Sequence, residues 1–375
     1  MKKSLVFGLV LSMVALSPAQ AAQVSAGKKC AKVNQKVTSD GKRYTCAKSG
    51  NKLAWKVIPA RPTSTPTPAP SPTAQPTESP TPVPVATPAT WKNYSASEVI
   101  SRATSEINAY LAIKRTPSQK ITVLAQEGTD SELKKWISEG ATLVAQAFLY
   151  PASTRPFYDV VAFDRTWLEE TYRKAGFNEA EVRDRLGGFD AGAPAFGGST
   201  TNTWNATTIK RENLLVRDKA GMAQTAGHEF FHSIQERLVG RNPGPRGEEI
   251  PNWFWEGPAM FVGIHSAAAI KAIDFVTEGR KASLDRFNMG SPSTKKLLLQ
   301  DVKANDGVTD PYGIGYAATE YLVAQVGVEK FLNIYAELGK SKNFATAFQD
   351  ATGFALSDFY DYFERDRQAL GFPRG

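Results

Sequence analysis

Apolar residues recur at helical spacing along the first part of the large C-terminal region, and short apolar runs lie between these stretches. Helical spacing is present at 95–113, 130–147 and 167–176. The short runs at 120–125 and 158–163 are rich in β-branched or aromatic residues, which is typical of strands. Helices that alternate with strands in this way predict a sheet covered by helices.

The rest of this region has a different pattern. The stretch 187–205 is rich in glycine and predicts irregular structure, with a short strand near 193–196. From Asp218 onward, nearly every segment has helical spacing. Asp130 is a suitable N-cap for one of the earlier helices, and Trp136 marks the face of that helix that we expect to be buried. The region therefore predicts an α+β fold, with one sheet packed on helices.

The N-terminus has the features of a secretory signal over residues 1–21. Lys2 and Lys3 precede an apolar stretch at 5–16, and residues 19–21 fit a small-x-small cleavage site. The apolar stretch is short of a full membrane span, which disfavours an anchor. We therefore expect a secreted, extracellular protein.

Residues 22–58 are basic and rich in turn residues, and they contain the two cysteines of the chain. Ser39-Asp40-Gly41 lies between two runs of alternating polar and apolar residues, which predicts a β-hairpin. In an exported protein, Cys30 and Cys46 most simply pair with each other. Closing this loop would contribute roughly 3 kcal/mol, and a module of this size needs such a crosslink. The segment therefore predicts a small disulfide-linked β module.

A linker follows this module. Residues 59–90 are rich in Pro, Thr, Ser and Ala, a composition that cannot bury a core and that predicts an extended, disordered spacer. We expect residues 91–375 to form one globular domain.

The positive charge of the chain is concentrated in the small module. Residues 28–56 contain nine Lys or Arg residues and one acidic residue, Asp40, whereas residues 91–375 carry a net charge of −2. A secreted cationic module would be attracted to an anionic cell-wall polymer or membrane surface. A solvated face that only improves solubility explains the same charges equally well. The scarcity of aromatic residues in the module argues against a nucleic-acid partner.

The most informative motif is HEFFH at residues 228–232, because the chain has only three histidines. In a helix, positions four residues apart differ by about 40° around the axis, so His228 and His232 project from one face. Two neutral imidazoles supply half of a tetrahedral zinc site. Glu229 can reach a water that the zinc activates, without binding the metal, and would act as its general base. The motif therefore predicts one zinc ion per chain.

The third protein ligand has two candidates downstream. Glu256 lies in a strongly apolar, aromatic segment, where coordination of a cation would offset the cost of a buried carboxylate. His265 comes nine residues later and would face the opposite side of the same helix, so the two cannot bind one metal ion together. We favour Glu256 and expect His265 to lie on the surface or to form a local hydrogen bond.

The HExxH motif followed by WEGPA at residues 255–259 resembles the gluzincin zinc metallopeptidases of the MA clan, especially the aminopeptidase-N-like group. The segment PYGIGYA at 311–317 is similar to the P-Y-x-x-G-F-A segment of that family, and residues 328–367 resemble the helices that close its catalytic domain. The resemblance covers roughly residues 215–370. It implies zinc-dependent hydrolysis of a peptide or protein substrate.

The resemblance also implies a zincin-like fold, with a small mixed sheet packed on helices and a helical C-terminal part. In that family the tyrosine of the P-Y-x-x-G-F-A segment stabilises the oxyanion of the tetrahedral intermediate, and by residue match this role falls on Tyr312. A phenol donor opposite the zinc suits a developing oxyanion, although a tyrosine before a helix more often only packs.

The chain departs from the family pattern in three places. The gap between His232 and Glu256 is 23 residues, a few more than usual, and Trp255 stands where the family has asparagine. The G-x-M-E-N motif is missing, and the corresponding stretch, 191–204, has no carboxylate near its centre. An exopeptidase needs an anion to hold the substrate ammonium, so this favours internal cleavage. The same stretch could be a sheet edge that pairs with an extended substrate.

We therefore expect a secreted zinc endopeptidase in which His228, His232 and Glu256 bind zinc, Glu229 is the base and Tyr312 stabilises the oxyanion. One alternative is an aminopeptidase with an unrecognised amine anchor. Another is a non-catalytic protein that binds a cell surface and uses the peptidase-like domain as a scaffold. The presence of all three ligand candidates together with the base argues against this last alternative.

Overall fold

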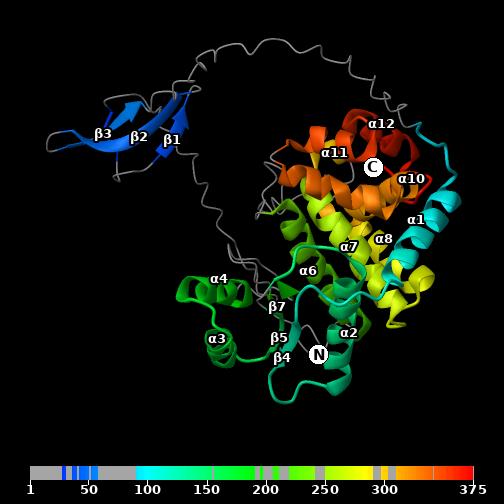
Figure 1. Ribbon diagram of the computed structural model, residues 1–375, viewed down its shortest axis with the longest axis horizontal. Helices are drawn as coiled ribbons and strands as arrows, with labels where there is room; N and C mark the ends of the chain where they lie inside the picture. The colour runs from blue at the N-terminus through cyan, green and yellow to red at the C-terminus, as the bar shows by residue number, and fades with distance from the viewer. Residues whose placement is uncertain are drawn as a thin grey trace, which may run out of the picture. The chain divides into compact units, whose positions relative to one another are not determined.

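The computed structural model describes two compact units, Met1–Val83 and Pro84–Gly375 (Figure 1). The described residues are 28–30, 36–39, 42–49, 52–57, 90–153, 156–190, 195–196, 206–210, 219–240, 250–289, 297–302, 310–340 and 342–374. The expected signal at 1–21 lies outside them, and so do residues 59–89 of the expected linker. In this described part of the chain, no helix combines the length and the apolar character that crossing a membrane requires.

The first unit contains a three-stranded antiparallel sheet of order β1-β2-β3. Its strands are β1 (Lys36–Ser39), β2 (Lys42–Ser49) and β3 (Lys52–Val57). The predicted hairpin is confirmed by the antiparallel pairing of β1 and β2, while its turn residues, Asp40 and Gly41, lie outside the described residues.

A disulfide joins Cys30 to Cys46, as predicted, with the two Cα atoms 5.8 Å apart. The two cysteines are buried together with Tyr44 and Trp55, and Leu53 packs against this cluster. The crosslink is therefore the centre of the small core that the sheet can build.

The second unit is mostly helical and contains a four-stranded mixed sheet of order β4-β5-β7-β6. The strands are β4 (Ile121–Ala125), β5 (Phe157–Ala162), β6 (Ala195–Phe196) and β7 (Ala206–Lys210). β4, β5 and β7 are parallel, whereas β6 pairs antiparallel with β7 at the end of the sheet. The α+β class predicted from the sequence is confirmed.

Helices make up most of this unit. They are α1 (Ala96–Leu111), α2 (Ser131–Ala147), α3 (Arg165–Lys174), α4 (Glu179–Asp190), α6 (Lys219–Val239), α7 (Asn252–Ala269), α8 (Arg280–Met289), α10 (Pro311–Gly339), α11 (Phe344–Thr352) and α12 (Leu356–Asp366), with a π-helix, η1 (Phe275–Gly279), and a 3₁₀-helix, η2 (Leu299–Asp301). α10 is interrupted at Gly327, whose φ of 78° and ψ of 166° are readily adopted only by glycine.

Alternating residues of β5 face two different layers of helices. Val160 and Ala162 belong to a cluster with Leu168 of α3 and Leu186 of α4. Phe157 faces the other way and meets Phe230 of α6, with ring centroids 4.7 Å apart. Figure 1 shows the same arrangement, with α3 and α4 on one side of β4, β5 and β7 and with α2 on the other.

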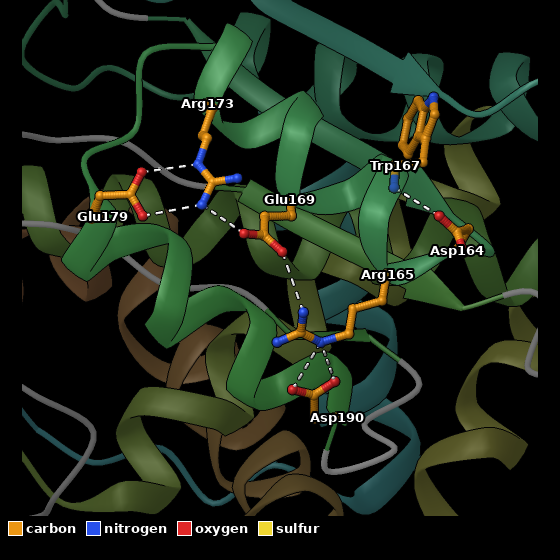
Figure 2. A network of polar contacts seen from close by, with 7 residues as sticks. All are labelled: Asp164, Arg165, Trp167, Glu169, Arg173, Glu179 and Asp190. Carbon is orange, nitrogen blue, oxygen red and sulfur yellow. Dashed lines mark hydrogen bonds and ion pairs between the residues drawn. The ribbon is translucent and has the colours of Figure 1, made fainter.

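A network of ion pairs joins α3 to α4 at the surface (Figure 2). Arg165 pairs with Asp190 at 3.0 Å, and Arg173 pairs with Glu179 at 2.9 Å and with Glu169 at 2.6 Å. Solvent and salt screen exposed pairs of this kind, so apolar contacts under the two helices dominate the packing.

One sequence prediction for this unit is wrong. α4 continues through Gly187 and Gly188 to Asp190, where irregular structure was expected, because burial of Leu186 and the pair with Arg165 hold its last turn.

The expectations for α2 agree better with the structure. Its buried face lies beside Trp136 and is formed by residues such as Leu133, Ile137 and Val144, while Trp136 itself is half-buried. The predicted N-cap, Asp130, is confirmed.

α7 lies at the centre of the unit, between α6 and α10. Its residues from Asn252 to Ala267 are all buried, as expected for a helix that is apolar on every side. The contact with α6 is close at Gly263, where an added β-carbon would lie 2.5 Å from the carbonyl oxygen of Gln224 and 3.1 Å from the backbone nitrogen of His228.

We therefore expect Gly263→Ala to force α7 away from α6 and to lower the free energy of unfolding by about 1–3 kcal/mol. Chemical denaturation measures this change. Gly187→Ala is the matched control, because a β-carbon there meets no atom within 4 Å. Helix propensity predicts that the control is unchanged or more stable by up to about 1 kcal/mol. Equal stability of the two variants would show that the helices can separate without cost.

Candidate metal centre

Three side chains from two helices converge within the second unit. His228 and His232 come from α6 and Glu256 comes from α7, and together they form a group that could hold a metal ion. The Nε2 atoms of the two histidines are 3.1 Å apart, and each lies 3.3 Å from Oε2 of Glu256. The three side chains expose only 10–14% of their surface.

These distances fit one tetrahedrally bound cation. Ligand bonds of about 2.0 Å place the ligand atoms of a tetrahedral zinc site about 3.3 Å apart. Oε2 of Glu256 is buried and has no hydrogen bond of normal geometry, although two imidazole nitrogens point at it. Two nitrogens and one carboxylate oxygen are also a common donor set for catalytic zinc. The residues present therefore fit a metal ion of this type.

Electrostatics at the cluster favour positive charge. Burial alone would raise the pKa of Glu256, but the imidazoles of His232 and His228 hold it well below its usual range. Burial opposes a charge on His232, yet Glu256 and Glu229 raise the pKa of that imidazole to about 9. A proton on His232 and a bound cation would therefore satisfy the same requirement, because both compensate the buried carboxylate.

Gln235 fixes the orientation of His232, which it follows by one helical turn on α6. Its Nε2 donates to the carbonyl oxygen of Trp255 and to the hydroxyl of Tyr335, both at 2.9 Å. Its Oε1 must then accept from Nδ1 of His232, at 2.7 Å. This bond keeps the proton on Nδ1 and leaves a lone pair on Nε2, the atom that faces Glu256.

Pro258 explains why Tyr335 takes part in this arrangement. A proline inside a helix has no N–H, so the carbonyl of Phe254, four residues earlier, loses its usual partner. The hydroxyl of Tyr335 donates to that carbonyl at 2.8 Å and accepts from Gln235. Pro258 thus leaves the Phe254 carbonyl free to accept from Tyr335, and Tyr335 in turn accepts from Gln235, the residue that orients His232.

Tyr312 and Glu229 lie beside the cluster rather than in it. The Tyr312 ring centroid is 5.9 Å from that of His228. Burial first, and then the charges of Glu256 and Glu229, raise the pKa of the Tyr312 phenol well above its usual value. Tyr312 is therefore a protonated hydrogen-bond donor at neutral pH.

Asp310 and Arg286 hold Tyr312 in the first turn of α10. Asp310 is the N-cap and accepts from the backbone nitrogen of Tyr312 at 3.0 Å. Nε of Arg286 lies 2.6 Å from Oδ2 of Asp310, and its guanidinium carbon is 4.9 Å from the Tyr312 ring centroid. The proline and tyrosine of the PYGIGYA segment therefore begin helix α10, and the tyrosine is oriented by a charge pair.

His265 does not belong to the metal group, but the expectation of a surface or locally bonded histidine is wrong. It is 1% exposed, and neither ring nitrogen has a hydrogen-bond partner among the described residues. Its ring stacks on Phe275 and packs against Phe261. Burial lowers the pKa of His265 to about 3, so it is a neutral core side chain.

The sequence matches no known family model and no curated protein. The functional interpretation therefore depends on the geometry of the cluster. Sequence reasoning places His228, His232 and Glu256 in that cluster, but it does not identify Gln235, Arg286 or Asp310. The spacing of Gln235 from His232, which puts both on one face of α6, is the available signal.

We expect Gln235→Leu to weaken zinc binding about 10- to 100-fold, because His232 loses the acceptor that fixes its tautomer. Competition against a zinc-chelating dye measures the affinity. Tyr335→Phe is the control, since it removes a hydroxyl from the same hydrogen-bond chain and leaves the Gln235–His232 bond in place. An affinity of Gln235→Leu equal to that of the parent would rule out the positioning role.

The burial of neutral His265 should make the free energy of unfolding depend on pH in acid. The unfolded chain takes up a proton on this imidazole below its ordinary pKa of about 6.5, and the folded chain does so only near pH 3. Stability is therefore lost as the pH falls between these values, by at most about 1.4 kcal/mol per pH unit. His265→Leu should remove this loss, so its stability relative to the parent should increase steadily toward low pH in denaturation curves. A difference that is independent of pH would contradict the assignment.

Proposed function

We propose that this chain is a secreted, zinc-dependent peptidase of the gluzincin type, and that it cleaves peptide bonds inside its substrates. The observation that carries the proposal is the cluster of His228, His232 and Glu256, whose ligand atoms lie 3.1–3.3 Å apart. Its HExxH helix and the following glutamate are the features on which the family resemblance rests.

Each role that such chemistry requires can be assigned to a residue of this chain in or beside the cluster. Zinc, when bound by His228, His232 and Glu256, supplies Lewis acidity toward a water and toward the substrate carbonyl. Glu229 accepts the proton of the attacking water and passes it to the leaving amine. The Tyr312 phenol donates a hydrogen bond to the oxygen that becomes negative.

The sheet offers a place for an extended substrate. β6 is the last strand of the sheet in the described part of the unit, and it pairs only with β7. Of the stretch 191–204, expected to be an edge for substrate, only Ala195 and Phe196 of β6 belong to the described residues. A peptide that adds a strand there would be held through its backbone, which suits cleavage at internal bonds.

Asp310 bears on the choice between internal cleavage and an aminopeptidase. Burial raises the pKa of Asp310, and the charge of Glu256 adds to this effect, so the two carboxylates are within electrostatic range. Asp310 is occupied, however, because it caps α10 and pairs with Arg286. A carboxylate engaged in this way is poorly placed to hold a substrate ammonium group, which favours the endopeptidase.

The Cys30–Cys46 disulfide is compatible with the proposed extracellular location, where disulfides persist. The alternative of a non-catalytic surface-binding protein makes a different prediction for metal content and turnover. The two can therefore be separated by one set of variants.

We expect about one zinc per chain by mass spectrometry, and its loss in His232→Ala and Glu256→Gln. Glu229→Gln should keep the zinc and lose about 10²–10⁴-fold in turnover of quenched peptides, because only the base is removed. Tyr312→Phe should also keep the zinc and lose about 10²–10³-fold. Cleavage of peptides with blocked amino termini distinguishes internal cleavage from the aminopeptidase alternative.

A parent protein that binds no zinc after reconstitution would overturn the peptidase proposal and favour the surface-binding alternative. Zinc retained in Glu256→Gln would assign the third ligand elsewhere. Turnover unchanged in Glu229→Gln would show that another group is the base.

A further inference from the structure

The strand register of the first unit places cations and hydroxyl residues side by side. In β1-β2-β3, partner residues on neighbouring strands lie on the same face of the sheet. Lys36 of β1 pairs with Thr45 of β2, and Thr45 pairs with Lys56 of β3. The two lysines therefore flank a threonine in one row, about 9.6 Å apart at the usual strand spacing.

The remaining pairs extend this row into a face. Arg43 pairs with Thr38, and Lys52 pairs with Ser49. Lys29 forms a β-bridge with Ala54 and so adds a cation on the side of β3 that faces away from β2. We call the face that carries Lys29, Lys52 and Lys56, and to which the strand register assigns Lys36 and Arg43, the cationic face.

The opposite face of the sheet has a different character. Tyr44, Cys46 and Trp55 occupy alternate positions there and form the buried disulfide cluster. Lys42 and Lys48 share this face by strand alternation. The described strands therefore place their large apolar residues on one face and most of their cations on the other.

The composition of the cationic face indicates what it could bind. None of the three strands contains an acidic residue, and the residues between the cations are Thr, Ser and Ala. Lys29, Lys52 and Lys56 are exposed. The face has no aromatic side chain on which bases could stack and no large apolar one that could enter a bilayer.

We propose that the cationic face binds a linear polyanion that carries phosphate groups along its backbone. Lysine and arginine paired with neighbouring hydroxyls are the groups that typically contact phosphate oxygens. Cations distributed over three strands of one face suit a polymer that neutralises several at once, rather than one small anion. This proposal goes beyond the peptidase function and does not depend on it.

The test compares two double variants of the full chain that lose the same net charge. Lys52→Gln with Lys56→Gln removes two exposed cations of the cationic face, and Lys42→Gln with Lys48→Gln removes two from the other face. Binding to immobilised linear polyphosphate is measured over a range of salt concentrations. Mass spectrometry under non-reducing conditions confirms that the Cys30–Cys46 disulfide is formed in each variant.

We expect the first double variant to bind polyphosphate roughly 10- to 30-fold more weakly. The slope of the logarithm of affinity against the logarithm of salt concentration should become shallower by about 1.4, which corresponds to two lost phosphate contacts. The second double variant should stay close to the parent.

Equal weakening of both double variants would overturn the proposal, because binding would then follow net charge rather than one face. A parent that binds phosphatidylglycerol vesicles but not polyphosphate would also overturn it, in favour of a membrane surface. Failure of the parent to bind either probe would leave the cations with only a solubilising role.

Discussion

The cost of burying the carboxylate of Glu256 is the constraint on which the candidate site depends. The central helix α7 is buried along almost its whole length, and the Glu256 side chain exposes only 10% of its surface. An uncompensated charge in such a place would be strongly destabilising. Helix α6 supplies the compensation, because the Nε2 atoms of His228 and His232 each lie 3.3 Å from Oε2 of Glu256. The packing of α6 against α7 and the capacity of the cluster to hold a cation are therefore two aspects of one arrangement.

The surroundings of the cluster make this arrangement rigid. Gly263 allows α7 to approach the backbone of α6 more closely than any other residue would permit. Pro258 frees a carbonyl in α7, and Tyr335 of α10 and Gln235 of α6 complete the hydrogen bonds that this creates. Three helices thus meet at one polar chain inside an apolar core. A chain of this kind fixes the tautomer and the direction of a ligand, which a purely apolar contact could not do.

The parts of the structure that could be predicted are those in which local pattern and tertiary packing agree. The helices near 95–113 and 130–147 have strong periodicity and clear caps, and both are confirmed. The metal group could be predicted because helical geometry alone brings together residues four positions apart. Glu256 could be predicted because an acidic residue in an aromatic segment has few ways to be accommodated.

The features that sequence reasoning misses depend on partners that are distant along the chain. The end of α4 contains two glycines, and its helical form is stabilised by α3 and the sheet rather than by its own propensity. Gln235 resembles an ordinary polar residue of an amphipathic helix until Tyr335, one hundred residues later, is placed beside it. Arg286 and Asp310 belong to different helical segments, so their pairing has no local signal.

His232 and His265 show why residue type alone does not define a site. Both are enclosed, and burial disfavours the charged form of each. His232 lies beside Glu256 and Glu229, so the pKa of its imidazole rises, whereas His265 lies between two phenylalanine rings and its pKa falls. An imidazole therefore belongs to a group that could hold a cation in α6, whereas in α7 it is a neutral core side chain. What separates them is the position of two carboxylates, and the first of these is held in place by the burial of α7.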